Sequence, residues 1–177
     1  SMFANNVKYN KIGSLFPSLT NLLLNTYVTK SIMGISIKRS VPKLTPKTLK
    51  SWYKKQTHSS SKKIIYVFCD EFTNFYDTEI GKDTVIVLKR LGYNPTFIKH
   101  PESGRSFISK GFLKEAKALA NKNVSIFKEL ITDKTPLIGI EPSAILTFRD
   151  EYIRLADDVN SAKIIAKNTF TIEEFLK

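Results

Sequence analysis

Short apolar runs along the second two-thirds of the chain predict strands. Residues 63–69 and 137–140 are mostly hydrophobic and rich in β-branched side chains, a pattern typical of strands covered on both faces. We expect a second strand at 94–99 and a fourth at 163–167. Connections of helix length separate these runs, as happens where neighbouring strands lie parallel.

Apolar residues at helical spacing fill the stretches between the strands. One helix is expected at 78–91, with Gly92 as its stop. A longer helix is expected at 109–131, where an apolar residue recurs every three or four positions. Residues 70–77 are expected to form a loop, and Pro142 suits the first turn of a further helix. The alternation predicts an α/β fold with a small, Rossmann-like parallel sheet flanked by helices.

The first third of the chain has a different character. We expect a short helix at 17–27, an extended proline-containing piece at 41–46 and a second short helix just after it. Residues 56–61 include three consecutive serines and have the composition of a linker. We therefore divide the chain into a mostly helical arm with linker at 1–61 and an α/β domain at 62–177. The arm is expected to pack on that domain or on a neighbouring one.

The last residues contain a signal for a helix start. Thr-Ile-Glu-Glu at 171–174 has the form of a capping box, in which a hydroxyl and a carboxylate each satisfy a backbone donor. Only three residues follow it. We expect the chain to be a fragment of a longer protein.

Charge is distributed unevenly. The net charge is +12, yet residues 1–63 hold twelve Lys and Arg and neither Asp nor Glu, whereas the remainder has sixteen of each sign. Such a basic arm suits an acidic face of a neighbouring domain, a solvated surface, nucleic acid or an anionic membrane. Because the arm has an amphipathic leucine pattern and no nucleic-acid-binding module, we expect docking to a protein domain and at most peripheral membrane contact.

Composition narrows the class further. A hydrophobic content of 42% with twelve phenylalanines indicates a globular protein. No apolar run approaches the ~20 residues needed to cross a bilayer. The chain has one cysteine, Cys69, which sits in an apolar run and is expected to be a packed strand residue. A single thiol fits a reducing compartment, so we expect a cytoplasmic protein.

Polar side chains follow three of the predicted strands. Loops at the carboxyl ends of parallel strands converge at one edge of a sheet, where α/β proteins bind ligands. The candidate pocket residues are Asp70, Glu71, Asn74, His100, Arg105, Glu141, Ser143 and Arg149, with Arg149 reaching back from the next helix. Three interpretations remain open: a structural cluster of paired side chains, a site for a small ligand or metal, and acid–base catalysis. His100 precedes a proline and is expected to face water.

Familiar catalytic motifs are missing from the sequence. It contains no Gly-x-Ser-x-Gly elbow, no phosphate-binding P-loop and no Gly-x-Gly-x-x-Gly turn. A serine hydrolase and a nucleotide-binding site are therefore not expected in this piece.

Three groups of residues carry a resemblance to a known family. They are Phe-Thr-Asn at 72–74 with Glu-Ile-Gly at 79–81, Ser-Gly-Arg at 103–105 with Ser-Lys-Gly at 109–111, and Gly-Ile-Glu-Pro-Ser at 139–143 with Phe-Arg-Asp-Glu-Tyr at 148–152. On these motifs the chain resembles the cysteine-rich CCG iron–sulfur domain of FAD-linked oxidoreductases of the D-lactate dehydrogenase and glycolate oxidase kind. The likeness covers most of the chain and is strongest over 63–152.

The resemblance places the iron–sulfur ligands at positions that lack sulfur here. The family has a Cys-Cys pair directly before the Gly-Arg of the first loop and another cysteine at the end of the second, where this chain has Glu102, Ser103 and Ala144. A cluster of this kind needs about four thiolates. We therefore expect a degenerate site without a 4Fe–4S cluster, no metal, and no cofactor or catalytic residue in this piece.

The resemblance also implies that this chain is the C-terminal part of such an enzyme. FAD is expected in the parent protein, and the flavin-binding domain of that protein is the expected partner, contacted through the basic arm. The expected role is structural or docking, without catalysis by the isolated piece. Two alternatives from other classes remain: a small-anion binding domain that uses Arg105 and Arg149 as anchors, and a basic nucleic-acid adaptor.

Overall fold

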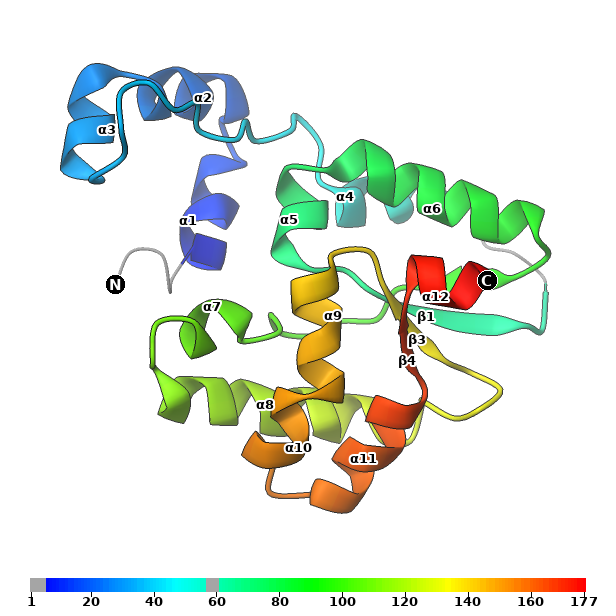
Figure 1. The fold of residues 1–177 in the computed structure, drawn as a ribbon. Helices are drawn as coiled ribbons and strands as arrows, with labels where there is room; N and C mark the ends of the chain where they lie inside the picture. The colour runs from blue at the N-terminus through cyan, green and yellow to red at the C-terminus, as the bar shows by residue number, and fades with distance from the viewer. Residues whose placement is uncertain (1–5, 57–60) are drawn as a thin grey trace.

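A parallel sheet lies at the centre of the computed structural model, which describes residues 6–56 and 61–177 (Figure 1). Within these residues its four strands are β1 (Ile64–Phe68), β2 (Asn94–Thr96), β3 (Leu137–Gly139) and β4 (Thr169–Thr171), in the order β2-β1-β3-β4. All neighbouring pairs are parallel. The expected α/β fold with a small parallel sheet is confirmed. Most of the expected linker, residues 57–60, lies outside the described residues.

Helices cover both faces of the sheet. Along the described chain they are α1 (Asn6–Gly13), α2 (Pro17–Leu24), α3 (Tyr27–Ile32), α4 (Leu49–Tyr53), α5 (Glu71–Phe75), α6 (Thr78–Arg90), α7 (Arg105–Ile108), α8 (Leu113–Phe127), α9 (Pro142–Arg149), α10 (Glu151–Leu155), α11 (Val159–Lys167) and α12 (Ile172–Leu176). Helices α6 and α12 pack on one face, and α8 to α11 pack on the other (Figure 1).

Alternate side chains of β1 enter the two layers of the core. Ile65 and Val67 point to the side of α6, where they pack with Leu88. Phe68 points to the opposite side, and its ring centroid lies 4.9 Å from that of Phe148 on α9. Because both faces are buried, β1 is hydrophobic throughout its length, as its sequence predicts.

Two expected elements are corrected by the structure. The predicted strand at 163–167 is the end of α11, since Asp158 accepts a hydrogen bond from the backbone N of Ser161 and so starts a helix there. The fourth strand follows at β4. The predicted loop at 70–77 contains α5, because the carboxylate of Asp70 accepts hydrogen bonds from the first backbone donors of that helix.

Other boundaries also shift. The helix predicted over 109–131 is shorter in the structure, where α8 begins at Leu113, after Gly111 with its φ of +76°, and ends at Phe127. The second strand ends at Thr96 instead of residue 99. The helix predicted at 78–91 and the capping box at Thr171 and Glu174 are confirmed.

The arm comprises α1 to α4 and an extended segment, residues 41–45. The helix predicted at 17–27 is α2, which ends at Leu24, and a separate helix, α3, begins at Tyr27 because Thr26 caps it through the backbone N of Thr29. No pattern in the sequence had indicated α1. Figure 1 shows α1 to α3 grouped at one end of the molecule, beside α5.

Helix α4 fastens the arm to the α/β layers. Leu49 is fully buried and lies against Gly81 of α6. The hydroxyl of Tyr53 donates a 2.7 Å hydrogen bond to the carbonyl of Pro95 in β2, and its ring stacks on Phe97 at 4.2 Å. These contacts join the end of the arm to the edge of the sheet.

Among the described residues, no helix is both long enough and apolar enough to span a bilayer.

Gly139 tests the packing between β3 and α9. A methyl group at this position would overlap the side chain of Ile145, so we predict that Gly139→Ala lowers the free energy of unfolding by about 3 kcal/mol. Gly111→Ala is the control, since that position has open space and only a left-handed backbone, for which a loss of about 1 kcal/mol is expected. Urea denaturation of both variants measures the difference, and equal losses would contradict the packing described.

Candidate functional site

The strand-end site lies where the connections of β1 and β3 leave the sheet. These two strands are neighbours, β1 continues into α5, and β3 continues into α9. In doubly wound sheets such a switch in strand order opens the crevice that binds ligands. Residues of the connection after β2 join the site through His100, whose Nε2 accepts a 3.2 Å hydrogen bond from the backbone N of Cys69. The three predicted loops therefore do converge.

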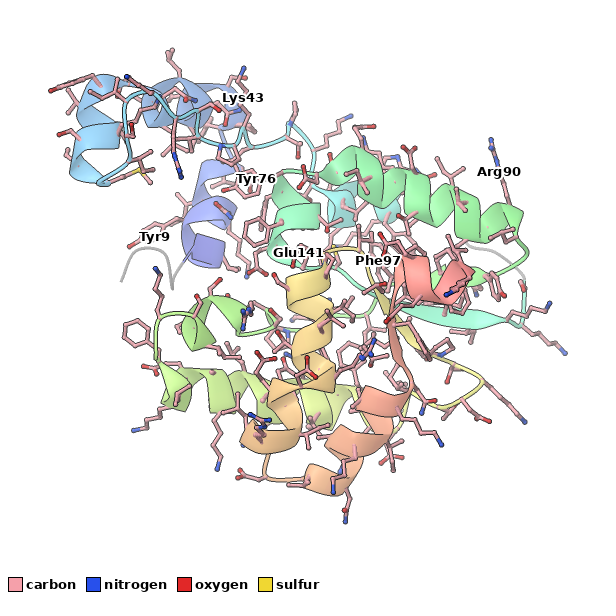
Figure 2. All side chains as sticks on the ribbon, viewed as in Figure 1. Tyr9, Lys43, Tyr76, Arg90, Phe97 and Glu141 are labelled. Carbon is pink, nitrogen blue, oxygen red and sulfur yellow. The ribbon has the colours of Figure 1, made fainter. Side chains whose placement is uncertain are left out.

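Two of the predicted carboxylates act as helix caps. Asp70 accepts hydrogen bonds from the backbone N of Phe72 at 2.8 Å and of Thr73 at 2.9 Å, and from the Thr73 hydroxyl at 2.6 Å. Glu141 lies at the start of α9, near α5 (Figure 2), and accepts from the backbone N of Ala144 at 2.7 Å. The Ser143 hydroxyl donates to the same carboxylate at 2.6 Å. Both helix starts are thus occupied by the protein's own negative charge.

Glu71 and Glu102 are less well satisfied. Glu71 is 5% exposed, one of its oxygens has no hydrogen-bond partner, and the other accepts a long hydrogen bond of 3.4 Å from the Ser106 hydroxyl. Burial raises the pKa of Glu71 to about 7, and the charges of Asp70 and Glu102 add to the rise. Burial also raises the pKa of Glu102, against the opposing positive charge of Lys11. Glu102 likewise has one buried oxygen without a partner.

His100 is partly buried against the core, so the expectation that it simply faces water is wrong. Its ring stacks on Phe68 with the centroids 4.2 Å apart. Burial lowers the pKa of His100 to about 4, and the positive charge of Lys50 adds to the effect. The ring is therefore neutral near pH 7, with Nδ1 donating to the carbonyl of Pro101 at 2.7 Å while Nε2 accepts.

Cys69 is buried, as its sequence context predicts. Burial raises the pKa of the thiol to about 12, against the opposing charge of Lys50. Its sulfur lies 3.8 Å from Oδ1 of Asn74, and that same oxygen accepts a 3.1 Å hydrogen bond from the backbone N of Lys50. Asn74 therefore ties α4 to α5, and the thiol is neither ionised nor accessible at neutral pH.

A buried network closes the loop that precedes α7. The hydroxyl of Tyr152 donates to the carbonyl of Ser103 at 2.8 Å and accepts from Nδ2 of Asn123 at 2.8 Å. The same amide nitrogen donates to the carbonyl of Glu102 at 3.0 Å. Ser103 and Asn123 are fully buried, and Ala144 is nearly so. Of the three positions at which the CCG family has cysteines, Ser103 and Ala144 are therefore buried, and Glu102 is half-buried.

Sequence reasoning had not included Asn123 or Tyr152 in the site. A usable signal existed for Asn123, because it lies on the apolar stripe of α8 between Ala120 and Phe127, where a polar residue needs buried partners. Tyr152 carried no such signal. Its role depends on the turn between α9 and α10, which no local pattern predicts.

Both predicted arginines are engaged in ion pairs. Arg105 contacts Glu151 at 2.9 Å. Arg149 contacts both carboxylate oxygens of Glu174 on α12, at 2.8 and 2.7 Å, so the expectation that it reaches back to the strand ends is wrong. Within residues 6–56 and 61–177, no three His, Cys, Asp or Glu side chains are arranged to hold a metal ion.

Comparisons with known proteins give partial matches. The chain is 29% identical to D-2-hydroxyglutarate dehydrogenase of Haemophilus influenzae over 89 residues, which is 50% of this chain and 9% of that protein. For the proteins of the same name from Escherichia coli and Pseudomonas putida, identity is 27% over 105 residues and 22% over 144 residues, covering 59% and 81% of this chain and 10% and 13% of theirs. The chain thus spans about a tenth of the length of these curated relatives. No family model and no solved structure matches it.

Glu71 makes the stability of the protein depend on pH. Its folded pKa of about 7 lies above the ordinary value of 4.5, so the stabilisation from its bound proton is complete below pH 4.5 and is lost as the pH rises through 7. Glu71→Gln removes this loss. We predict that it raises the free energy of unfolding at pH 8 by roughly 2 kcal/mol relative to the native protein, with a much smaller difference at pH 5.

Chemical denaturation at the two pH values measures this difference. Glu129→Gln, at an exposed position of the same charge, is the control and should leave the pH dependence unchanged. A Glu71→Gln variant whose stability runs parallel to that of the native protein from pH 5 to pH 8 would contradict the raised pKa.

Proposed function

We propose that this chain is a CCG-like module without a cluster, belonging to a larger flavin-dependent dehydrogenase of 2-hydroxy acids. Its role there is structural: it docks to the flavin-binding part of the enzyme, and electrons do not pass through it. The partial matches to proteins named D-2-hydroxyglutarate dehydrogenase support the link to an oxidoreductase. The motifs at 103–105, 139–143 and 148–152 support the likeness to the CCG family, and all three contribute residues to the strand-end site or to its closing network.

The observation that carries the proposal is the chemistry at the three cluster positions. Glu102, Ser103 and Ala144 offer no thiolate, and iron–sulfur clusters are held by thiolates. Ser103 already has its own partners, because its hydroxyl accepts from the backbone N of Arg105 and its carbonyl accepts from Tyr152. The residues present do not fit a 4Fe–4S cluster.

The rest of the enzyme supplies the redox chemistry in this proposal. FAD belongs to a separate flavin-binding part of the parent protein, and the substrate is a 2-hydroxy acid such as the D-2-hydroxyglutarate in the relatives' name. The module contributes a rigid α/β body whose buried polar network keeps the loop after β2 in place. Its basic arm is the part that contacts the flavin-binding domain.

The two alternative functions draw less support from the structure. An anion at the strand ends would meet the carboxylates of Asp70 and Glu141 at the two helix starts, and both candidate arginines are already paired. For a nucleic-acid adaptor, the exposed large hydrophobic side chains of the arm are mostly aliphatic, with Tyr9, Phe16 and Tyr27 as the aromatic ones, and the sequence contains no known nucleic-acid-binding module.

Iron binding tests the proposal. We predict that protein purified without oxygen and incubated with iron and sulfide, then desalted, retains neither iron nor absorbance in the visible range. The Cys69→Ser variant, which has no thiol at all, is the control and should behave identically. Retention of iron and sulfide in stoichiometric amounts, abolished by Cys69→Ser, would contradict the proposal.

The reading frame that encodes the chain is also expected to encode a flavin-binding domain.

A further inference from the structure

The arm holds its shape with polar side chains that point inward. Oδ1 of Asn21 accepts from the backbone N of Leu44 at 2.8 Å, and its Nδ2 donates to the carbonyl of the same residue at 2.9 Å. Oδ1 of Asn25 accepts from the backbone N of Val41 at 3.3 Å. The side-chain amides of α2 therefore hold the helix against the extended segment 41–45 through hydrogen bonds to its backbone.

Other polar groups of the arm are used in the same way. The hydroxyl of Thr20 donates to the carbonyl of Gly13 at 3.0 Å. Lys30 is buried, and its ammonium group donates to the carbonyl of Ile37 at 3.4 Å. The arm is thus organised before it meets any partner.

Apolar side chains of the arm point outward. No residue of α2 is buried. Eight large hydrophobic residues of α2, α3 and their flanks are between 52% and 81% exposed, and together they define the arm face: Leu15, Phe16, Leu19, Leu22, Leu23, Tyr27, Val28 and Ile32. Exposed apolar side chains gathered on two neighbouring helices are typical of an interaction site in a folded protein.

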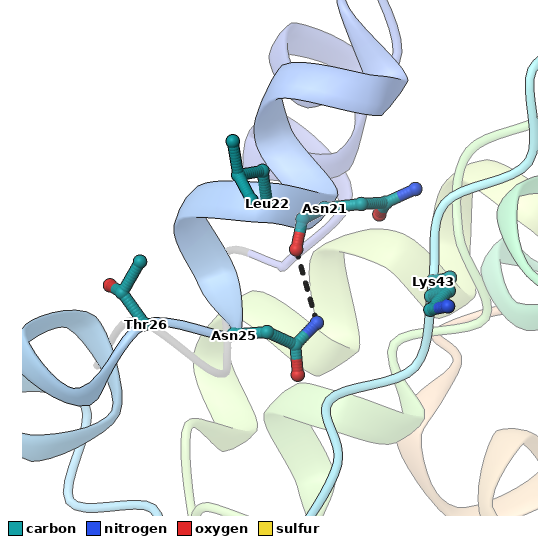
Figure 3. Close-up of a pocket in the computed structure, with 5 residues that line it drawn as sticks. All are labelled: Asn21, Leu22, Asn25, Thr26 and Lys43. Atoms are coloured by element: carbon teal, nitrogen blue, oxygen red, sulfur yellow. Dashed lines mark hydrogen bonds between the residues drawn. The ribbon is translucent and has the colours of Figure 1, made fainter.

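A groove lies at one side of the arm face. It has a volume of about 630 Å³ and is lined by Asn21, Leu22, Asn25, Thr26 and Lys43 (Figure 3). The lining combines an apolar side chain, amides that are already fixed by hydrogen bonds, and one ammonium group. Such a groove suits an apolar side chain of a partner that is flanked by a carboxylate.

Charge identifies the kind of partner. Residues 1–63 contain no Asp or Glu, and Lys11, Lys38, Arg39 and Lys43 surround the arm face in the sequence. A second copy of the chain would bring like charges together, which opposes self-association. A partner with an apolar centre and a rim of carboxylates is complementary in both respects.

A membrane is a poorer match for the same face. Helices that lie in a bilayer surface carry Lys and Arg on the side opposite their apolar face. Helix α2 has no charged residue, and its polar side is occupied by hydrogen bonds to segment 41–45. A folded protein surface therefore fits the arm face better than a lipid surface does.

We infer that the arm face docks onto an apolar, carboxylate-rimmed surface of the flavin-binding part of the same enzyme. This inference rests on the proposed function, and it specifies which side chains make the contact. The leucines of α2 supply the apolar centre, Leu22 lies at the groove, and Lys43 pairs with an acidic residue of the rim.

The test uses the intact enzyme encoded by the full reading frame. A photo-crosslinking amino acid replaces Leu22, and mass spectrometry identifies the residues to which it attaches. Attachment within the flavin-binding part, at apolar residues flanked by Asp or Glu, is the expected result. In the Leu19→Asp/Leu22→Asp variant, backbone hydrogen exchange of α2 is expected to become faster by about tenfold or more. The reason is that each buried leucine stabilises an interface by at least this factor in the equilibrium constant.

Ile80→Asp is the matched control, because Ile80 and Leu19 are both 56% exposed but Ile80 lies on α6, outside the arm face. It should leave hydrogen exchange of α2 unchanged. Circular dichroism checks that each variant is folded.

The outcomes separate the inference from the proposed function. An enzyme that contains FAD but attaches through position 22 to a second copy, to lipid, or to nothing overturns the docking inference and leaves the proposed function standing. An intact protein without flavin overturns the proposed function, and the docking inference falls with it. Equal hydrogen exchange of α2 in the native enzyme and in the double variant also overturns the inference.

Discussion

The hydroxyl of Tyr152 joins three parts of the fold that lie far apart in the sequence. It links α10 to Asn123 of α8 and to the carbonyl of Ser103 in the loop before α7. Burial raises the pKa of this hydroxyl well above its usual range, so it stays protonated and remains a donor at every physiological pH. Since unpaired buried polar groups are costly, the loop is held in one arrangement, and Ser103 is fully buried there.

Opposite charges meet between the arm and the strand-end site. Four carboxylates lie near one another at the strand ends. The charge of Glu141 raises the pKa of Asp70, and the charges of Asp70 and Glu102 raise the pKa of Glu71. The positive charge of Lys11, in the arm, opposes the rise in the pKa of Glu102, whereas that of Lys50 in α4 lowers the pKa of His100. Lys11 therefore offsets part of the buried acid in the α/β layers, while the arm face remains exposed. One segment thus completes the fold and presents the proposed docking surface.

Sequence reasoning succeeded where local signals dominate. The apolar run of β1, the stop at Gly92 and the capping box at Thr171 each depend on neighbouring residues, and all are present. The strand-end rule also predicted correctly that the loops after β1, β2 and β3 meet. It could not predict α5, which depends on the carboxylate geometry of Asp70, or the pairing of Arg149 with Glu174 on a helix 25 residues away. Contacts of that range are set by the tertiary fold.

Removing the Tyr152 hydroxyl tests the closed network most directly. In Tyr152→Phe the carbonyl of Ser103 and the amide of Asn123 lose a buried partner, so the free energy of unfolding should fall by about 1–3 kcal/mol. Amide hydrogen exchange of residues 102–105 should become faster by the factor that corresponds to this loss. The Tyr27→Phe variant, at an exposed position, is the control and should change neither the free energy of unfolding nor the exchange rate. Unchanged exchange at 102–105 in Tyr152→Phe would show that the loop is held by other forces and would contradict the account.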